Sequence, residues 1–379
     1  MGIGLRPIAF YLPQFHQIPE NNEWWGKGFT EWSNVVRAKP LFKGHYQPHL
    51  PADLGFYDLR LPEARQAQAD LARAHGIYGF CYYHYWFSGR RLLERPFDEV
   101  LRSGQPDFPF MLCWANHNWT RVWDDLNKSV LLRQEYSPED DVNHIRSLIP
   151  AFKDRRYITV EGKPVFCIYR SNDLPEPKKT ISIWREEARK EGLELYLCRL
   201  EGFAGSGVDF LEIGLDAAIE VQPFSSAFFE IRGDSGETLR DGITLHRLKK
   251  SLSYRLTKLV NHNARGFVID YKDVVERDLR SGAPGYKRYP GVAPMWDNSA
   301  RRKSGYVILR NSTPELYERW LREKVENFTP FSAQENFMFI NSMNEWAEGN
   351  HLEPCQRWGR SFLEATSKVL LNGSTSREA

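Results

Sequence analysis

The sequence contains little cysteine, and its five cysteines are widely separated. No C-x-x-C pair occurs, so neither a disulfide framework nor a zinc site is predicted. Reduced cysteines buried in a core are usual in cytoplasmic proteins, and we therefore predict a cytoplasmic location. Four of the five stand inside apolar segments, namely Cys81, Cys113, Cys167 and Cys198.

Long hydrophobic runs are also missing from the chain. No apolar stretch approaches the ~18 residues that a membrane-spanning helix needs, so no transmembrane segment is predicted. The first candidate strand begins by Ile8, and we therefore expect no signal peptide. No fixed-period repeat occurs. Only residues 371–379, rich in Ser, Gly and Thr, have the composition of a disordered tail.

The chain has no large excess of charge of either sign. Its 51 Lys and Arg against 49 Asp and Glu give a net charge of +2, and the two signs are well mixed. A protein that binds nucleic acid usually carries a basic face, so no nucleic-acid partner is predicted. The histidines and acidic residues lack metal-ligand spacing, and no glycine-rich phosphate turn follows the first strand. We therefore predict neither a metal nor another cofactor.

Aromatic residues, in contrast, are abundant. They make up 14% of the chain and include 12 tryptophans, more than a core of this size requires. Surplus Trp and Tyr at the mouth of a fold favour flat ligands with an apolar face, and sugars are the commonest such ligand of a neutral enzyme. The sequence therefore predicts a carbohydrate substrate, while it leaves the oligomeric state open.

Short apolar runs recur along the chain, and most are followed by a segment of helix length. A run without polar alternation is typical of a parallel strand buried on both faces. Eight such runs predict a (β/α)8 barrel in a single domain, 1–370, with a variable insertion at 225–285. A doubly wound open sheet is the alternative fold. The expected strands are 8–12, 79–83, 110–114, 165–169, 195–198, 216–219, 291–295 and 337–340.

Polar and aromatic clusters follow these runs, and ligands bind in parallel α/β folds at the C-terminal ends of the strands. The segment 22–51 shows neither helical nor strand periodicity, so we expect an ordered loop across that rim. Each histidine could equally be a core residue, and the tryptophans could simply close the barrel. The candidate substrate-binding residues are His16, Trp32, His84, Tyr85, Trp86, Trp114, Asn116, His117, Asn118, Trp119, Arg121, Trp296, Asn344 and Trp346.

Two glutamates follow the last run. Glu345 and Glu348 are three residues apart, on either side of Trp346. On a helical turn this spacing puts them on one face, roughly 5 to 6 Å apart at Cβ. Two carboxylates this close push their pKa values apart, so one keeps a proton while the other is ionised. This pair next to an aromatic ring favours glycoside hydrolysis. The alternative is an ordinary helix start, with Asn344 as its cap.

Several of these motifs together resemble the WbsX-like family. Its members occur in bacterial O-antigen and other polysaccharide loci and are often labelled glycosyltransferases. That family is similar in turn to glycoside hydrolase family 99, the endo-α-mannosidases, which are (β/α)8 barrels. The motifs that carry the resemblance are Pro13–His16, Trp24–Trp32, His45–Pro48, Gly79–Trp86, Trp114–Arg121 and Asn344–Pro354.

The resemblance implies roles for the two glutamates in retaining hydrolysis. Glu345 would take the proton from the sugar 2-hydroxyl, whose oxygen displaces the leaving group through a 1,2-anhydro intermediate. Glu348 would protonate the departing oxygen and then activate water, and shielding by Trp346 makes it the expected proton holder. Sugars with an axial 2-hydroxyl, such as mannose or rhamnose, are implied. The chain departs from the family at His117, usually glutamate, and at Cys355, usually aspartate.

Three functional hypotheses follow. The first is a retaining α-glycoside hydrolase that acts on a bacterial surface polysaccharide or its precursor. The second is a glycosyltransferase of polysaccharide biosynthesis, although the chain has no D-x-D motif of the kind that binds a nucleotide sugar through a metal. The third is a non-catalytic carbohydrate-binding barrel, which requires Glu345 and Glu348 to face away from the cavity.

Overall fold

A computed structural model of the chain describes residues 4–120, 130–202, 209–225, 228, 231 and 266–371. Its main sheet is parallel along a path of nine strand pieces, in the order β12-β10-β9-β8-β4-β2-β1-β15-β13. Nearly all side chains of these pieces are buried, which explains why their sequences do not alternate. The pieces are β1 (Arg6–Tyr11), β2 (Gly79–Phe87), β4 (Phe110–Trp114), β8 (Lys163–Ile168), β9 (Tyr196–Glu201), β10 (Ala217–Glu220), β12 (Arg288–Tyr289), β13 (Gly291–Val292) and β15 (Phe337–Ile340).

The two ends of this path belong to one broken strand, and this closes the sheet into a barrel. β12 pairs with β10, whereas β13, which follows directly after Pro290, pairs with β15. Gly291 is needed at the join, because a Cβ there would lie 2.1 Å from the carbonyl oxygen of Glu220. The predicted (β/α)8 barrel is confirmed, and the open doubly wound sheet is excluded.

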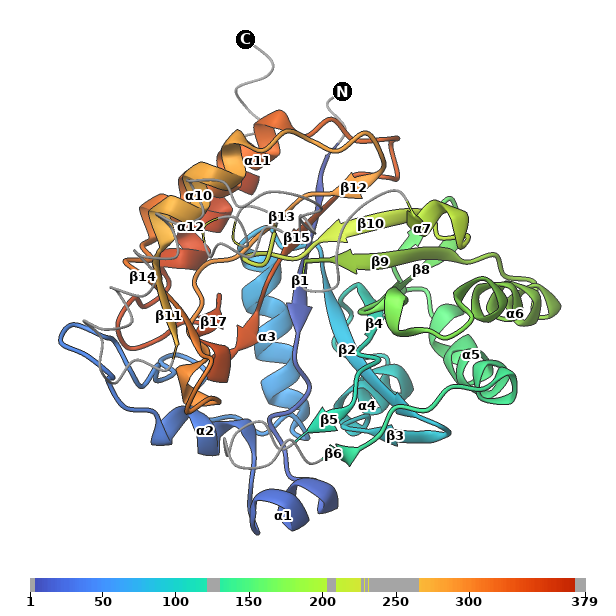
Figure 1. Ribbon diagram of the computed structural model, residues 1–379, viewed down its shortest axis with the longest axis horizontal. Helices are drawn as coiled ribbons and strands as arrows, with labels where there is room; N and C mark the ends of the chain where they lie inside the picture. The colour runs from blue at the N-terminus through green and yellow to red at the C-terminus, as the bar shows by residue number, and fades with distance from the viewer. Residues whose placement is uncertain are drawn as a thin grey trace, which may run out of the picture.

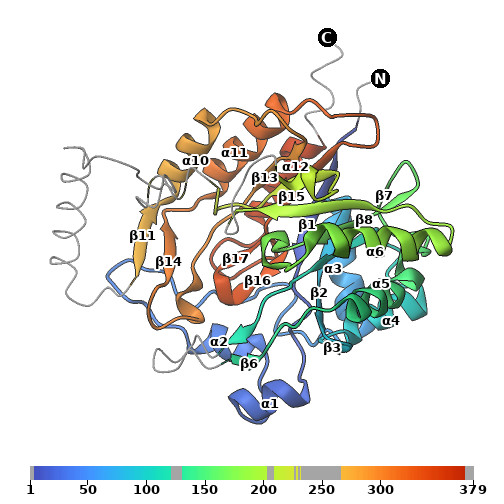
Figure 2. The same ribbon diagram turned by 45° about the vertical axis from the view of Figure 1, so that its right-hand side comes forward.

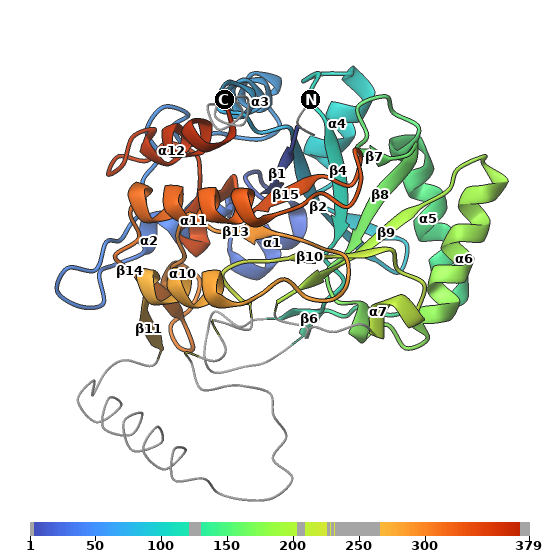
Figure 3. The ribbon, with the colours of Figure 1, turned by 90° about the horizontal axis from the view of Figure 1, so that it is seen from above.

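Helices surround the barrel (Figures 1 and 3). α5 packs beside α6, and α11 lies between α10 and α12. Proline stands in the first turn of five of them (α3, α4, α5, α6 and α11), where a backbone N–H has no helical partner to lose. The helices are α3 (Pro62–Ala74), α4 (Arg95–Ser103), α5 (Pro138–Phe152), α6 (Pro177–Lys190), α7 (Asp209–Glu212), α10 (Tyr271–Arg280), α11 (Pro314–Asn327) and α12 (Ser361–Leu370).

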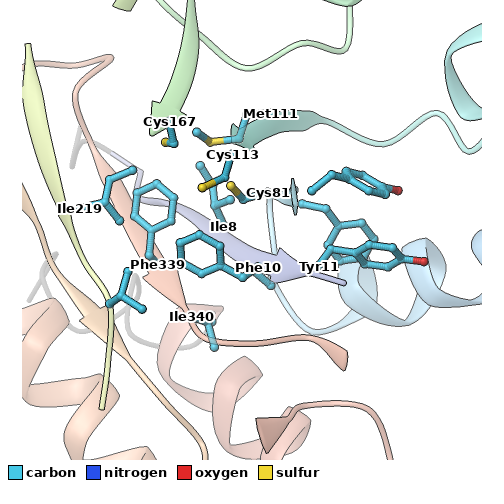
Figure 4. Packing of buried hydrophobic residues seen from close by; sticks show 14 of the residues in the cluster. Ile8, Phe10, Tyr11, Cys81, Met111, Cys113, Cys167, Ile219, Phe339 and Ile340 are labelled. Carbon is cyan, nitrogen blue, oxygen red and sulfur yellow. The ribbon is translucent and has the colours of Figure 1, made fainter. Parts of the chain in front are cut away.

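Side chains fill the inside of the barrel, as they do in barrels of this size. Phe10 and Phe339 meet with ring centroids 5.7 Å apart, beside a group of sulfur-containing side chains (Figure 4). Cys113 and Cys167 are direct neighbours across β4 and β8. All five cysteines are buried and unbridged, as the sequence predicted.

The rim at the C-terminal ends of the strands carries shorter elements. Those from the N-terminal segment and the last strand lie at the same end of the molecule (Figure 2). Among the described residues, no helix is long and apolar enough to cross a membrane. One short strand, β7 (Thr159–Val160), lies at the opposite end, because it pairs with the first residues of β8. The other shorter elements are α1 (Pro19–Trp25), α2 (Glu31–Arg37), β3 (Arg90–Leu92), β5 (Trp119–Thr120), β6 (Val130–Leu132), η1 (Ser171–Asp173), β11 (Phe267–Asp270), η2 (Asn298–Ala300), β14 (Val307–Arg310), β16 (Asn344–Glu345), η3 (Trp346–Glu348) and β17 (Asn350–His351).

One expectation about the chain needs correction. The segment 22–51 is not free of helix, because it holds the end of α1 and all of α2, each only seven residues long. Helices this short complete too few turns to show a period, although Thr30 and Ser33 form a capping box at the start of α2. In the expected insertion 225–285, β11 pairs in parallel with β14 outside the barrel. Most of the remaining insertion, and all of the tail after residue 371, lie outside the described residues.

Candidate active site

A cavity of about 730 Å³ opens at the C-terminal rim of the barrel. Loops that follow β1, β4, β8, β10, β13 and β15 contribute to its wall. Both aromatic rings and polar groups line it, a composition that suits a ligand with apolar faces and hydroxyl groups. Its aromatic lining includes Trp24, Trp25, Phe29, Tyr83, Trp119, Tyr169 and Trp296, and its polar lining includes Glu31, His117, Asn118, Arg170, Asn341, Arg301 and Glu348.

The glutamate pair stands on a tight hairpin at this rim. Glu348 lines the cavity, whereas Glu345 is buried beside Arg301 and does not line it. Asn344 and Glu345 form β16, which pairs with β17, and a single 3-10 turn from Trp346 to Glu348 connects the two strands. No α-helix starts here, so the alternative in which Asn344 caps a helix is wrong. Its side chain instead accepts from the backbone N–H of Leu12 at 2.7 Å and donates to the Leu12 carbonyl at 3.0 Å. The hairpin is thereby fastened to the end of β1.

Arg301 holds the two glutamates together. Its Nη2 lies 3.1 Å from Glu345 Oε2, and its Nη1 lies 2.8 Å from Glu348 Oε1. Because both carboxylates contact one planar guanidinium, they face the same point. Arg301 also contacts Glu31 at 3.0 Å. Neither Glu31 nor Arg301 was among the predicted site residues, although Glu31 stands inside the quoted motif Trp24–Trp32.

The two glutamates differ in their surroundings. Glu345 is buried, and burial raises its pKa to about 8, with Arg301 opposing the rise and Glu348 and Glu31 adding to it. The Glu348 side chain remains 22% exposed and lines the cavity. The sequence argument took Glu348 as the shielded proton holder, whereas the structure shields Glu345 more strongly. Burial thus favours the protonated form of Glu345 near neutral pH.

Trp346 is part of the packing beneath the pair. Its ring stacks on His351 at 3.8 Å between centroids, and its Nε1 donates to Glu353 Oε2 at 2.6 Å. Glu353 also accepts from Tyr57 and Gln68, and burial raises its pKa to about 7. Trp346 does not line the cavity, so the expectation that it forms a sugar platform is not supported.

A close contact between two rim loops fixes the backbone of Glu348. The Asp297 N–H donates to the Glu348 carbonyl at 2.7 Å, and Gly349 adopts a φ of 52° directly after it. A Cβ on Gly349 would lie 2.9 Å from the Asp297 Cβ, so only glycine permits this approach. Asp297 Oδ2 accepts from His45 Nε2 and Gln47 Nε2, each at 2.7 Å. Burial would raise the Asp297 pKa, but the His45 hydrogen bond helps to hold it below its ordinary value.

Several other predicted residues do line the cavity. His117 stands in the loop after β4 and Trp119 begins β5. Burial together with Arg170 lowers the pKa of His117 to about 4. His117 is therefore uncharged near pH 7, so the negative charge that the usual glutamate would bring to this part of the rim is missing. Those of the fourteen candidate binding residues that line the cavity are His117, Asn118, Trp119 and Trp296.

Three of the other candidates support the fold instead of lining the cavity. His84 and Trp86 belong to β2, where alternation turns them outward, and His84 Nε2 lies 3.0 Å from His144 Nε2 on α5. Trp86 donates to Asp140 at 3.0 Å. Trp114 packs on His144 and Trp184. These three side chains fill the space between barrel and helices, which explains their aromatic character.

Three further candidates, Asn116, Tyr85 and Trp32, hold rim loops in place. Asn116 accepts from the Arg170 N–H at 2.7 Å and donates to the Arg170 carbonyl at 2.8 Å. Tyr85 accepts from Gln14 at 2.8 Å, and Trp32 donates to the Tyr57 carbonyl at 2.8 Å. His16 is buried without a hydrogen-bond partner among the described residues. Asn344 and Trp346 are described above, and Arg121 lies outside the described residues.

No group of three or more His, Cys, Asp or Glu side chains that could hold a metal ion occurs in the described part of the chain. The second departure from the family pattern, Cys355, is 1% exposed and does not line the cavity. Its backbone forms bridges with Pro51 and Gly359, and its side chain belongs to the main hydrophobic core.

Comparison with known proteins agrees with the motifs. The family described as "Glycosyltransferase WbsX" matches residues 7–366. The chain belongs to this family. It is 41% identical over 369 residues to "Uncharacterized protein WxcX" of Xanthomonas campestris pv. campestris, in two strains, and the match covers 96% of this chain. The match covers 49% of those proteins, so the chain spans about half the length of the curated relatives it matches.

Solved structures show the same barrel. The GH99 endo-α-mannosidase of Bacteroides thetaiotaomicron is 14% identical, with a TM-score of 0.57 and coverage of 99% of both chains. A "Glycoside hydrolase-like protein" is 13% identical, with a TM-score of 0.58 and coverage of 97% of this chain and 94% of that one. At such low identity the likeness establishes the fold. The resemblance that was drawn from the motifs is confirmed.

Proposed function

We propose that this WbsX-family chain is a retaining α-glycoside hydrolase that acts in the cytoplasm on mannose- or rhamnose-type linkages of a bacterial surface polysaccharide or its precursor. The observation that carries the proposal is the convergence of Glu345 and Glu348 on Arg301 at an aromatic cavity. Retaining glycosidases need two carboxyl groups near one another across the scissile bond. The GH99 barrels, which resemble this one in fold, are described as endo-α-mannosidases.

The surroundings of the two glutamates suit a division of labour. Glu345 would accept the proton of the sugar 2-hydroxyl, and a carboxylate with a pKa of about 8 is a stronger base than an ordinary one. Glu348 faces the cavity and water, so it would protonate the leaving oxygen and then activate the water that opens the 1,2-anhydro sugar. The proposal requires the proton to stand on Glu348 when the sugar is bound.

The test is hydrolysis of purified mannose- and rhamnose-containing polysaccharides, measured as new reducing ends. The variant Glu348→Gln should lose turnover by about 10²- to 10⁴-fold, the usual contribution of a general acid, while it still binds the glycan. Glu364→Gln, on the exposed face of α12, is the matched control and should keep full activity. Undiminished hydrolysis by the Glu348 variant would remove the assignment.

A glycosyltransferase remains the second candidate, and the family description favours it. Transfer from a nucleotide sugar would need a site for the diphosphate, so calorimetry with nucleotide sugars separates the two. Binding tighter than about 10 μM would favour transfer, which corresponds to roughly 7 kcal/mol. The non-catalytic alternative required both glutamates to face away from the cavity, and Glu348 lines it.

A further inference from the structure

Glu31 brings a third carboxylate to Arg301 from a distant part of the chain. It is the first residue of α2, and its side chain is 1% exposed. Its Oε2 lies 3.0 Å from both Nε and Nη2 of Arg301. The same Nη2 contacts Glu345 at 3.1 Å. Glu31 and Glu345 therefore share one nitrogen of the guanidinium.

One cation serves three carboxylates at this point. Within the described ranges, Arg301 is the only positive group that forms an ion pair with Glu31, Glu345 or Glu348. If all three were ionised, the cluster would carry two uncompensated negative charges in a largely buried place, which is costly. The cluster therefore keeps a proton, and its location depends on how the guanidinium is shared.

The position of Glu31 is fixed by packing on the same loops. α2 contacts both η2, which precedes Arg301, and η3, which carries Glu348. The neighbouring Trp32 packs against Trp346, with 5.6 Å between ring centroids. These contacts hold the helix that carries Glu31 against the loops of Arg301 and Glu348.

We propose that Glu31 is a positioning residue that holds Arg301 between the two glutamates. Glu31 occupies part of the hydrogen-bonding capacity of Arg301 Nη2 that Glu345 would otherwise use. In this way Glu31 sets the pH at which Glu345 ionises. The inference rests on the proposed function, in which Glu345 acts as the base. Glu31 does not itself touch the reacting atoms; it acts through Arg301.

The groups that face Glu345 from the surrounding elements support this role. They are Arg301, Glu348 and Glu31, together with tyrosines from the ends of β2 and β8, Tyr83, Tyr85 and Tyr169. Burial raises the pKa values of these tyrosines, and they stay neutral through the range of interest. Among the carboxylates, Glu31 and Glu348 both favour the protonated form of Glu345.

The test is the variant Glu31→Gln in the full chain, studied by ¹³C NMR of glutamate-labelled protein across pH. The Glu345 carboxyl signal is assigned by its loss in Glu345→Gln. In the Glu31 variant we expect the Glu345 titration to move to lower pH by about one unit, since one like charge is gone and Nη2 is released to Glu345. The ascending limb of kcat/KM against pH should move with it. Glu20→Gln on α1, which removes the carboxylate partner of the exposed Arg90, should move neither.

A second variant keeps the inference testable if the first does not fold. Glu31→Asp draws the carboxylate back by one methylene, so the Glu345 titration should fall between wild type and Glu31→Gln. An unchanged Glu345 titration in whichever variant folds overturns the inference, even where hydrolysis slows. Absence of hydrolysis by the wild-type protein would instead remove the proposed function, because the NMR titration needs no substrate.

Discussion

Two clusters of side chains show the same pattern in the sequence, polar and aromatic residues near the ends of strands, but the structure places them differently. The acidic cluster consists of Glu31, Arg301, Glu345 and Glu348, and it meets at the cavity. The histidine cluster consists of His84, Trp86, Trp114 and His144, and it is buried between the barrel and its helices. Both clusters take residues from the ends of parallel strands. A polar or aromatic residue near a strand end is therefore no sufficient sign of a binding site.

The electrostatics of the two clusters differ as well. Burial lowers the pKa of His84 to about 3 and also lowers that of His144, so both imidazoles are neutral and one hydrogen bond joins them. In the acidic cluster, burial raises the pKa of Glu345, while Arg301 retains its charge. The histidine cluster thus stabilises the fold without a charge, and the acidic cluster keeps charged and titratable groups at the cavity. Three measurements test this contrast.

The largest effect is expected from Arg301→Gln. Removal of one partner from a buried ion pair costs about 3 to 5 kcal/mol, and Arg301 is the partner of three carboxylates. Protonation of the released carboxyls offsets part of this loss, so we expect a decrease of about 3 kcal/mol in the free energy of unfolding at pH 8 and a smaller decrease at pH 5. Urea titrations at both pH values measure this. An equal loss at both would mean that Arg301 acts by packing.

A smaller effect is expected from pH alone. Glu345 and Glu353 have folded pKa values of about 8 and about 7, above their ordinary value, so the folded state binds more protons than the unfolded state between pH 4.5 and 8. Their contribution to stability is complete below pH 4.5 and is lost as pH rises through 8, by up to about 1.4 kcal/mol per pH unit for each group. Glu353→Gln should flatten this part of the stability curve, as measured by thermal unfolding. If the slope of stability against pH is unchanged in Glu353→Gln, groups other than Glu353 cause the loss of stability at high pH.

The smallest effect separates the cavity from the histidine cluster. Trp119→Ala removes an aromatic lining residue, and we expect KM to rise by roughly fivefold, or about 1 kcal/mol of contact with a sugar face. His84→Leu leaves His144 Nε2 without its partner, so stability should fall by about 1 to 3 kcal/mol with KM unchanged. Measurement of KM and of the free energy of unfolding for both variants tests these expectations. A rise of KM in the His84 variant would bring that residue back to the binding site.

Much of the barrel could be predicted from the sequence. The runs 110–114 and 337–340 match β4 and β15 at both ends, because strands buried on both faces leave a continuous apolar signal. The helices α1 and α2 were missed, since seven residues are too few to show a period. β2 extends to Phe87, four residues beyond the expected strand, because pairing with β3 continues it. Such pairing is a tertiary contact and leaves no local pattern.

The candidate site was predicted in part. Glu345 and Glu348 were identified because two carboxylates three residues apart are visible in the chain itself. Arg301 and Glu31 were not, since their 270-residue separation hides their contact. The roles of His84 and Trp86 could not be read either, because a single register choice decides whether a strand residue faces the cavity or the helices.

The sequence alone therefore determined the barrel, the family and the pair of glutamates, because buried strands and short motifs are local properties of the chain. The tertiary structure decided which carboxyl is buried, which cation serves it and which aromatic side chains reach the cavity. These depend on the dielectric surroundings of each group and on contacts between segments far apart in sequence, and both arise only when the barrel closes.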